Sequence, residues 1–81
     1  MEKQLLSPTL MQNVFKMAPL VKEFPTSRLW LDYDREADVL YISLKRPQQA
    51  THSEMLDEVG IVLNYRQEEL VGITILEASK R

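Results

Sequence analysis

Apolar residues recur at about every second position from Arg28 onward, which is the period of a β-strand. The alternation runs through residues 29–33, 39–44, 61–65 and 70–76. The links between these segments are short or rich in turn-forming residues, and Pro47 ends the second one. The pattern predicts a four-stranded antiparallel meander, with residues 48–58 as a polar loop or a short irregular edge strand.

The N-terminal part of the chain has a helical period. Its apolar residues recur at three- and four-residue intervals, at Leu10, Val14, Met17, Ala18 and Val21. Ser7 followed by Pro8 is typical of a helix start, because Ser7 can accept from a free backbone N–H and Pro8 lacks only a donor that is unpaired there. Pro19 would remove a helical hydrogen bond, so we expect a break or kink. We predict one domain, residues 1–81, with a helical extension over 1–27 and a sheet core over 28–79.

Both faces of the predicted sheet are partly apolar. One face holds Leu29, Leu31, Leu40, Ile42, Leu44, Ile61, Leu63, Val71, Ile73 and Ile75, and the other holds Trp30, Val39, Tyr41, Val62, Leu70 and Leu76. The helix is expected to pack on one face, which gives an α+β fold, and a solvated second face would be more polar. We therefore expect a homodimer that shares the second face or its edge. The expected interaction residues are Trp30, Tyr41, Val62 and Leu70 of the sheet and Leu10, Val14 and Phe15 of the helix.

Composition narrows the class of function. With 44% hydrophobic and 27% charged residues, the chain has the composition of a folded globular protein. It has no cysteine, which excludes disulfides, thiolate catalysis and Cys-based zinc sites. Residues 28–81 hold seven Lys or Arg against ten Asp or Glu, so no clustered basic surface for nucleic acid is expected. No segment approaches the ~20 apolar residues of a membrane span, and no export signal is recognised, so we expect a cytoplasmic protein.

An acidic stretch lies between the first two predicted strands. Its carboxylates are spaced by two, at Asp32, Asp34, Glu36 and Asp38, as in the first half of a calcium-binding loop. Counted from Asp32, however, the sixth residue is Ala37 instead of Gly and the twelfth is Ser43 instead of Glu. The stretch is better explained as a hairpin turn in which Asp34 bonds its own backbone, Glu36 is solvated and Asp38 closes the turn.

The remaining polar residues form no recognisable catalytic set. His52 is the single histidine, and we expect it to be an exposed loop residue; a metal site with Glu54 or Asp57 is the less favoured alternative. Gly60 and Gly72 lie too far apart for a phosphate-binding loop. Gly60 is expected to permit a bulge or tight entry into the third strand, and Gly72 a bend or the close approach of another backbone or of an aromatic ring. We predict no catalytic, cofactor-binding or metal-ligating residues.

Three segments together resemble a known family. They are Tyr33-Asp34-x-Glu36-x-Asp38-x-Leu40-Tyr41-Ile42, Gly60-Ile61-Val62-Leu63-Asn64-Tyr65 and Val71-Gly72-Ile73-Thr74-Ile75-Leu76-Glu77-Ala78-Ser79. With them the chain resembles the domain of unknown function 2283 family of small bacterial proteins, over residues 28–79. The resemblance implies a compact β-rich fold and no established activity, with the helical segment as an extension found in part of the family. Some relatives look as if they are encoded beside toxin-like proteins, which suggests an antitoxin-like role by analogy.

We therefore expect a non-catalytic protein–protein interaction module that forms a homodimer and binds neither nucleic acid nor membranes. The alternative is a small-ligand or metal-binding protein, or an enzyme, that uses the acidic hairpin tip and the histidine: Asp34, Glu36, Asp38 and His52. DNA binding by the helix would need basic residues on its exposed side, where only Lys16 and Lys22 are available.

Overall fold

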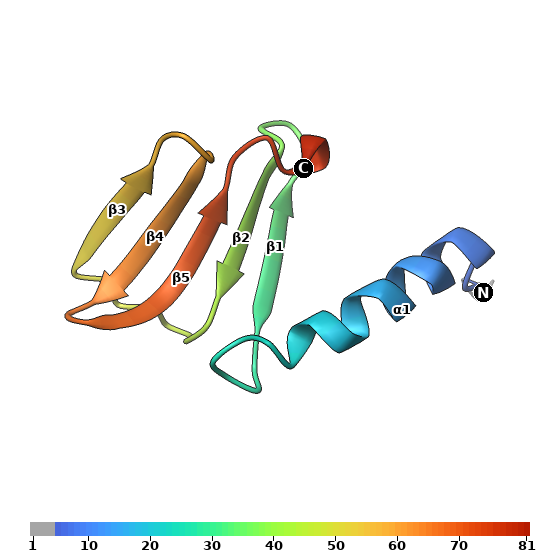
Figure 1. The fold of residues 1–81 in the computed structure, drawn as a ribbon, viewed down its shortest axis with the longest axis horizontal. Coiled ribbons are helices and arrows are strands. Elements are labelled where there is room, and N and C mark those ends of the chain that lie inside the picture. Colours follow the sequence, from blue (N-terminus) through green and yellow to red (C-terminus); the bar gives the residue numbers. More distant parts are fainter. Residues whose placement is uncertain (1–4) are drawn as a thin grey trace.

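The computed structural model describes residues 5–81 and contains one α-helix, five strands and a short 3-10 helix. The elements are α1 (Pro8–Val21), β1 (Trp30–Asp34), β2 (Val39–Ser43), β3 (His52–Leu56), β4 (Ile61–Arg66), β5 (Glu69–Ile75) and η1 (Ala78–Lys80). The strands form a single antiparallel sheet in the order β1-β2-β5-β4-β3 (Figure 1). The α+β fold, with an N-terminal helix and an antiparallel sheet, is confirmed.

Two details of the predicted sheet are wrong. The sheet has five strands, because part of the polar segment 48–58 forms the edge strand β3. The order is not a meander either, since β2 pairs with β5 and the chain then crosses to the far edge to begin β3 (Figure 1). This arrangement places the apolar strands β2 and β5 at the centre and the fully exposed β3 at an edge, where polar side chains discourage further pairing.

The register separates the side chains of the sheet into two unlike faces. One face, called the apolar face below, is defined by Leu31, Tyr33, Leu40, Ile42, Leu56, Ile61, Leu63, Ile73 and Ile75 in two cross-strand rows. The exposed Glu54 of the edge strand β3, which pairs with Leu63, also lies on this face. The other, called the mixed face, contains Trp30, Asp32, Tyr41, Ser43, Ser53, Met55, Val62, Asn64, Gly72 and Thr74. The division follows from the two-residue period of strands.

A β-bulge changes the face of one predicted interaction residue. Tyr65 of β4 pairs with Leu70, but Asn64 pairs with Gly72, so Val71 is an extra residue in β5. Because of this extra residue, the in-and-out alternation of β5 is inverted on the N-terminal side of Val71. Leu70 therefore lies on the same face as Tyr65, and on the opposite face from Gly72. Leu70 thus leaves the face of Trp30 on which the simple alternation had placed it. Val71 is fully buried, and its carbonyl accepts a 2.9 Å hydrogen bond from the amide of Leu44.

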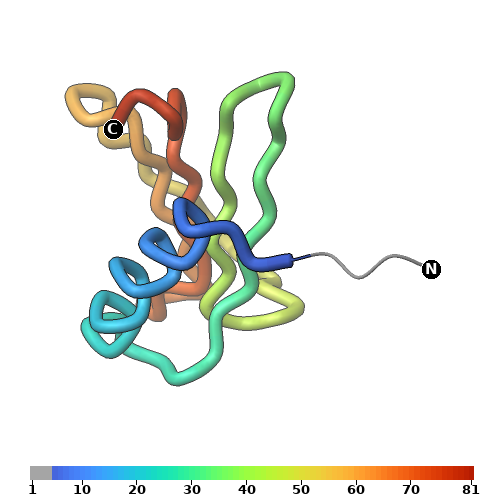
Figure 2. Tube along the Cα trace, turned by 90° about the vertical axis from the view of Figure 1, so that its right-hand side faces the viewer, coloured from blue at the N-terminus to red at the C-terminus, as the bar shows by residue number. Residues whose placement is uncertain are grey.

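The helix begins as predicted but does not pack on the sheet. The Ser7 hydroxyl accepts a 3.1 Å hydrogen bond from the amide of Leu10, and Pro8 opens the first turn. No residue of α1 is buried, and Figures 1 and 2 show it extending away from the sheet beyond β1. The expected packing of the helix on its own sheet is therefore wrong, because the connector after α1 leads the helix outward.

The helix also continues through Pro19 to Val21, so the chain does not break there as expected. Pro19 lies in the last turn, where only few hydrogen bonds remain to be made. The residue whose carbonyl loses its partner, Phe15, is 67% exposed, so water can replace the missing donor.

Candidate functional site

The acidic hairpin tip is a turn held by its own side chains. An oxygen of the Asp34 carboxylate accepts hydrogen bonds from the amides of Glu36 and Ala37, at 3.0 and 3.1 Å. The Glu36 side chain is exposed to solvent, as expected. The predicted role of Asp34 as a turn former is confirmed.

Asp38 has a second role that the sequence did not predict. Its Oδ1 accepts a 2.6 Å hydrogen bond from the Tyr33 hydroxyl and a 2.9 Å bond from the amide of Ser79. Its Oδ2 accepts a 2.7 Å bond from the Ser79 hydroxyl, and its carbonyl accepts from the amide of Ala78. Asp38 thus fastens the C-terminal segment to the hairpin, and we call these contacts of Tyr33, Asp38 and Ser79 the C-terminal clamp.

The clamp shifts the acidity of both of its ionisable groups. The hydrogen bond from Tyr33 lowers the pKa of the Asp38 carboxyl, and the two bonds from Ser79 act in the same direction. The hydrogen bond to Asp38 in turn raises the pKa of the Tyr33 hydroxyl. Both shifts of pKa favour an ionised Asp38 carboxylate beside a protonated Tyr33 hydroxyl. In this state the hydroxyl donates and the carboxylate accepts.

The C-terminal residue adds a further contact at the same end of the sheet. The Arg81 guanidinium donates to the carbonyl of Leu76 at 2.7 Å and to that of Gly60 at 3.3 Å. Gly60 has a φ of +67°, and a Cβ there would collide with this guanidinium. The predicted tight entry at Gly60 into the following strand is confirmed, and the glycine is needed both for its backbone angle and for the close approach of Arg81.

The structure brings His52 into a strand and not into the acidic tip. Its ring stacks on Tyr65, with 5.2 Å between the ring centroids and 11° between the planes. The two residues are directly paired between β3 and β4. Within residues 5–81, no group of three or more His, Cys, Asp or Glu side chains is arranged to hold a metal ion. His52 and the hairpin tip therefore do not form the common site of the alternative prediction.

The mixed face is partly covered by its own chain. The Gln48 carboxamide occupies the space where a Cβ of Gly72 would lie, and its Nε2 donates a 2.8 Å hydrogen bond to the Ser43 hydroxyl. Another group does approach Gly72 closely, but it is the polar side chain of Gln48 and not the backbone or aromatic ring that was expected. Trp30 and Val62 are half-buried on this face, and Tyr41 is 42% exposed. These three residues share a face, as the alternation predicted.

The apolar face, by contrast, has no cover over most of its width. Only Ile42 among its members is buried. Leu31 is 47% exposed, and Tyr33 and Leu56 are also exposed, while the other members are half-buried. A contiguous apolar surface of this kind marks a binding site more often than a free surface of a monomer.

The second uncovered apolar surface lies on α1. It comprises Leu10, Met11, Val14, Phe15, Met17 and Ala18, which are all exposed and lie on one side of the helix. We call this surface the helix stripe. It contains Leu10, Val14 and Phe15, the three helix residues expected to take part in binding. The structure leaves the helix stripe and the apolar face apart from each other.

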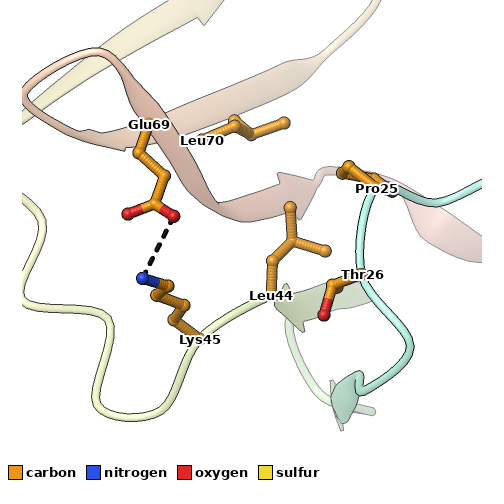
Figure 3. A pocket seen from close by; sticks show the side chains of 6 residues that line it. All are labelled: Pro25, Thr26, Leu44, Lys45, Glu69 and Leu70. Carbon is orange, nitrogen blue, oxygen red and sulfur yellow. Dashed lines mark ion pairs between the residues drawn. The ribbon is translucent and has the colours of Figure 1, made fainter.

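A shallow pocket lies between the connector that follows α1 and the sheet. Pro25 and Thr26 lie beside Leu44 and Leu70, and the rim carries an ion pair of 3.0 Å between Lys45 Nζ and Glu69 Oε2 (Figure 3). Both partners of the pair are more than half exposed, so it contributes little to stability. The pocket is the place where the chain leaves the sheet, and its residues carry no catalytic grouping.

The fold and its surfaces define a small α+β protein with an open antiparallel sheet. The family model of a protein of unknown function, DUF2283, matches residues 30–79, and the chain belongs to this family. The match begins at the first residue of β1 and ends at Ser79 of the C-terminal clamp. No curated protein and no solved structure matches the chain. None of the helices described for residues 5–81 is long and apolar enough to cross a membrane.

The limits of the match give the family pattern a structural explanation. Tyr33, Asp38 and Ser79, which belong to the segments that carry the resemblance, meet in the clamp although Asp38 and Ser79 are 41 residues apart. The family unit is thus the sheet together with its clamp. The helix α1 lies outside the matched residues.

Proposed function

We propose that this protein is a non-catalytic protein–protein interaction module that forms a homodimer through the apolar face and α1. The amount of surface that the chain leaves in water supports this proposal. Its accessible surface is 6901 Å², whereas a folded monomer of this mass is expected to expose ~5,000 Å². The radius of gyration is 14.8 Å, against ~12 Å for a compact chain of this length. The single chain therefore leaves surface uncovered that a stable fold normally buries.

The excess is large enough for a specific interface. A standard interface removes ~800 Å² from each partner, and the surplus here is roughly twice that. The uncovered residues are apolar, so their burial is favourable in proportion to their area. A second copy of the same chain is the simplest partner, because it offers the same apolar surfaces in a closed, symmetric arrangement.

The apolar face replaces the mixed face as the first surface that a partner must cover. The prediction of Trp30, Tyr41 and Val62 as interaction residues assumes that the helix covers the opposite face of the sheet. In the structure α1 covers neither side, and the more apolar of the two is open. The mixed face also has Gln48 of its own chain above Gly72. Contacts of Trp30, Tyr41 and Val62 with a partner are therefore secondary in this proposal.

Two matched substitutions test the proposal. Leu31 and Tyr41 lie on the paired strands β1 and β2, have similar exposure and point to opposite faces. In sedimentation at micromolar concentration, the unaltered protein should have twice the chain mass of 9.5 kDa. Leu31→Lys should shift it to the single-chain mass, because a buried unpaired ammonium opposes association. Tyr41→Lys should leave the dimer in place.

The possible results separate the surfaces clearly. An unaltered protein that sediments only at 9.5 kDa contradicts the homodimer. Dissociation by Tyr41→Lys alone would assign the interface to the mixed face. The antitoxin-like role implied by the resemblance would use the same surface with a toxin-like protein in place of the second copy. A second protein copurifying in fixed stoichiometry would support that version.

A further inference from the structure

The helix α1 has a capped N-terminus, but its apolar side chains are not covered by the rest of the chain. Ser7 and Pro8 begin it correctly, yet none of its 14 residues is buried. Helices shorter than ~15 residues are marginal in water when nothing packs against them. A helix of this length with an open apolar stripe therefore requires a surface to cover.

The connector makes the chain's own sheet an unsuitable surface. The amides of Glu23 and Phe24 donate to the carbonyls of Leu20 and Val21, at 3.1 Å each, so the turn after the helix is fixed. Pro25 and Thr26 follow this turn and line a shallow pocket together with Leu44 and Leu70 of the sheet (Figure 3). From this connector, α1 leaves the sheet along the direction seen in Figure 1. Folding α1 back onto its own sheet would require the bonded turn at residues 20–24 to rearrange.

The size of α1 matches that of the apolar face. Fourteen residues of helix extend ~21 Å, and strands of five to seven residues extend ~17–23 Å. One helix therefore spans the strands from end to end. Its diameter of ~10 Å covers about two strands. The neighbouring strands β5 and β4, whose apolar-face residues are half-buried, provide this width beside the buried Ile42 of β2.

Charge also favours contact between the helix of one copy and the sheet of another. The described part of α1 contains Lys16 and no acidic residue. Residues 28–81, which form the sheet, hold three more acidic than basic residues. Opposite net charges assist encounter and orient the partners, although the apolar contact supplies most of the affinity.

We infer that the homodimer is formed by reciprocal helix exchange, in which α1 of each copy lies with its helix stripe on the apolar face of the other. This inference rests on the proposed homodimer and specifies its architecture. Each copy then fills with its partner's helix the surface that its own helix cannot reach. The contact is repeated twice about a two-fold axis, so the assembly is closed at two copies and does not extend to a third.

The absence of cysteine from the sequence permits a direct test. Val14→Cys places a thiol on the helix stripe, and Leu63→Cys or Leu31→Cys places one on the apolar face. The two single variants are prepared separately, one with a purification tag to distinguish the masses, and are then mixed and oxidised. The expected main product is a disulfide between a Val14→Cys chain and a sheet variant chain. It should form at least about tenfold faster than with Gln12→Cys, which lies ~160° around the helix from Val14, since groups held together react at a high effective concentration.

Each other product overturns the exchange. A main product joining two Val14→Cys chains would indicate helix–helix contact, and one joining two Leu63→Cys chains would indicate contact between two sheets. In both cases a dimer would persist in sedimentation, so the proposed function would stand while the exchange failed. A chain carrying both Val14→Cys and Leu63→Cys that closes on itself as a monomer would refute both. Failure of the mixed product at both sheet positions would also contradict the exchange.

Discussion

The acidic hairpin end and the apolar face of the sheet differ in how far the rest of the chain supplies contacts for their side chains. The acidic hairpin end is rich in polar groups, and each carboxylate oxygen of Asp38 has a partner within the chain. The apolar face has the composition of a core, yet most of its side chains remain in contact with water. Polar groups whose bonds are made within the chain stabilise the fold. Burial of apolar groups is favourable wherever it occurs, so we propose the interaction on the face that has no recognisable polar site.

The largest effect on the hairpin end is expected from Asp38→Ala, because one substitution removes the acceptor of three hydrogen bonds to Tyr33 and Ser79. The C-terminal segment should separate from the hairpin. Hydrogen exchange should show the amide of Ser79 losing its protection, together with a lower melting temperature.

Asp38→Ala also tests whether the clamp and the apolar face are independent of each other. Tyr33 belongs both to the clamp and to the apolar face, but its ring stays in place when the Asp38 carboxylate is removed. Asp38→Ala should therefore sediment with the same mass as the unaltered protein. A clamp variant that became monomeric while still folded would show that the two regions are not separate. Ser79→Ala serves as a milder companion, since it removes the hydroxyl bond but keeps the backbone amide bond.

A smaller effect is expected from Asp34→Ala. This change removes two local hydrogen bonds, to the amides of Glu36 and Ala37. The loss should be about 1 kcal/mol of unfolding free energy, as for other side chains that cap backbone amides. Chemical denaturation measures it. Protection of the Ser79 amide should be unchanged, because Asp34 has no bond to that segment; a loss there would contradict the separation of turn and clamp.

The elements that could be predicted were those whose pattern is local. The helix start at Ser7 and Pro8 and the turn at Asp34 each depend on residues within one turn of the chain. The strands β1, β2, β4 and β5 alternate because one of their faces is apolar. β3 could be predicted only as one of two alternatives, a loop or a short edge strand, because a fully exposed edge strand has no buried face to impose alternation.

What could not be predicted depends on contacts distant in sequence. The bond between Asp38 and Ser79 joins residues 41 apart, and nothing near either residue specifies the other. The pairing of β2 with β5 depends on matching whole strands. The position of α1 was wrong for a different reason. A helix stripe shows that a helix will pack, but it does not say whether the surface belongs to the same chain.

The smallest expected effect is the response of the clamp to acid. The pKa of Asp38 in the folded protein is lowered from its ordinary value of 3.8 by the bonds from Tyr33 and Ser79. A lowered folded-state pKa means that the ionised carboxylate contributes its full stability above the ordinary value, and that this contribution is lost as pH falls through the lowered pKa. Unfolding free energy should therefore decrease below pH 3.8 in part because of this residue. A protonated carboxyl still fills its place and can still accept, so the loss should be smaller than in Asp38→Ala.

Asp38→Asn isolates this contribution, because the amide keeps the shape of the side chain and does not titrate. Denaturation curves recorded from neutral pH down to pH 3 should show a weaker decline for Asp38→Asn than for the unaltered protein, and the Ser79 amide should stay protected longer in acid. Dimer mass measured over the same series adds the comparison with the apolar face, whose one carboxylate, Glu54, lies on the edge strand β3. Hydrophobic contact does not titrate, so association should persist at a pH where the clamp has weakened. If the unfolding free energy of Asp38→Asn and of the unaltered protein declined identically with pH, the Asp38 charge would contribute nothing to the clamp.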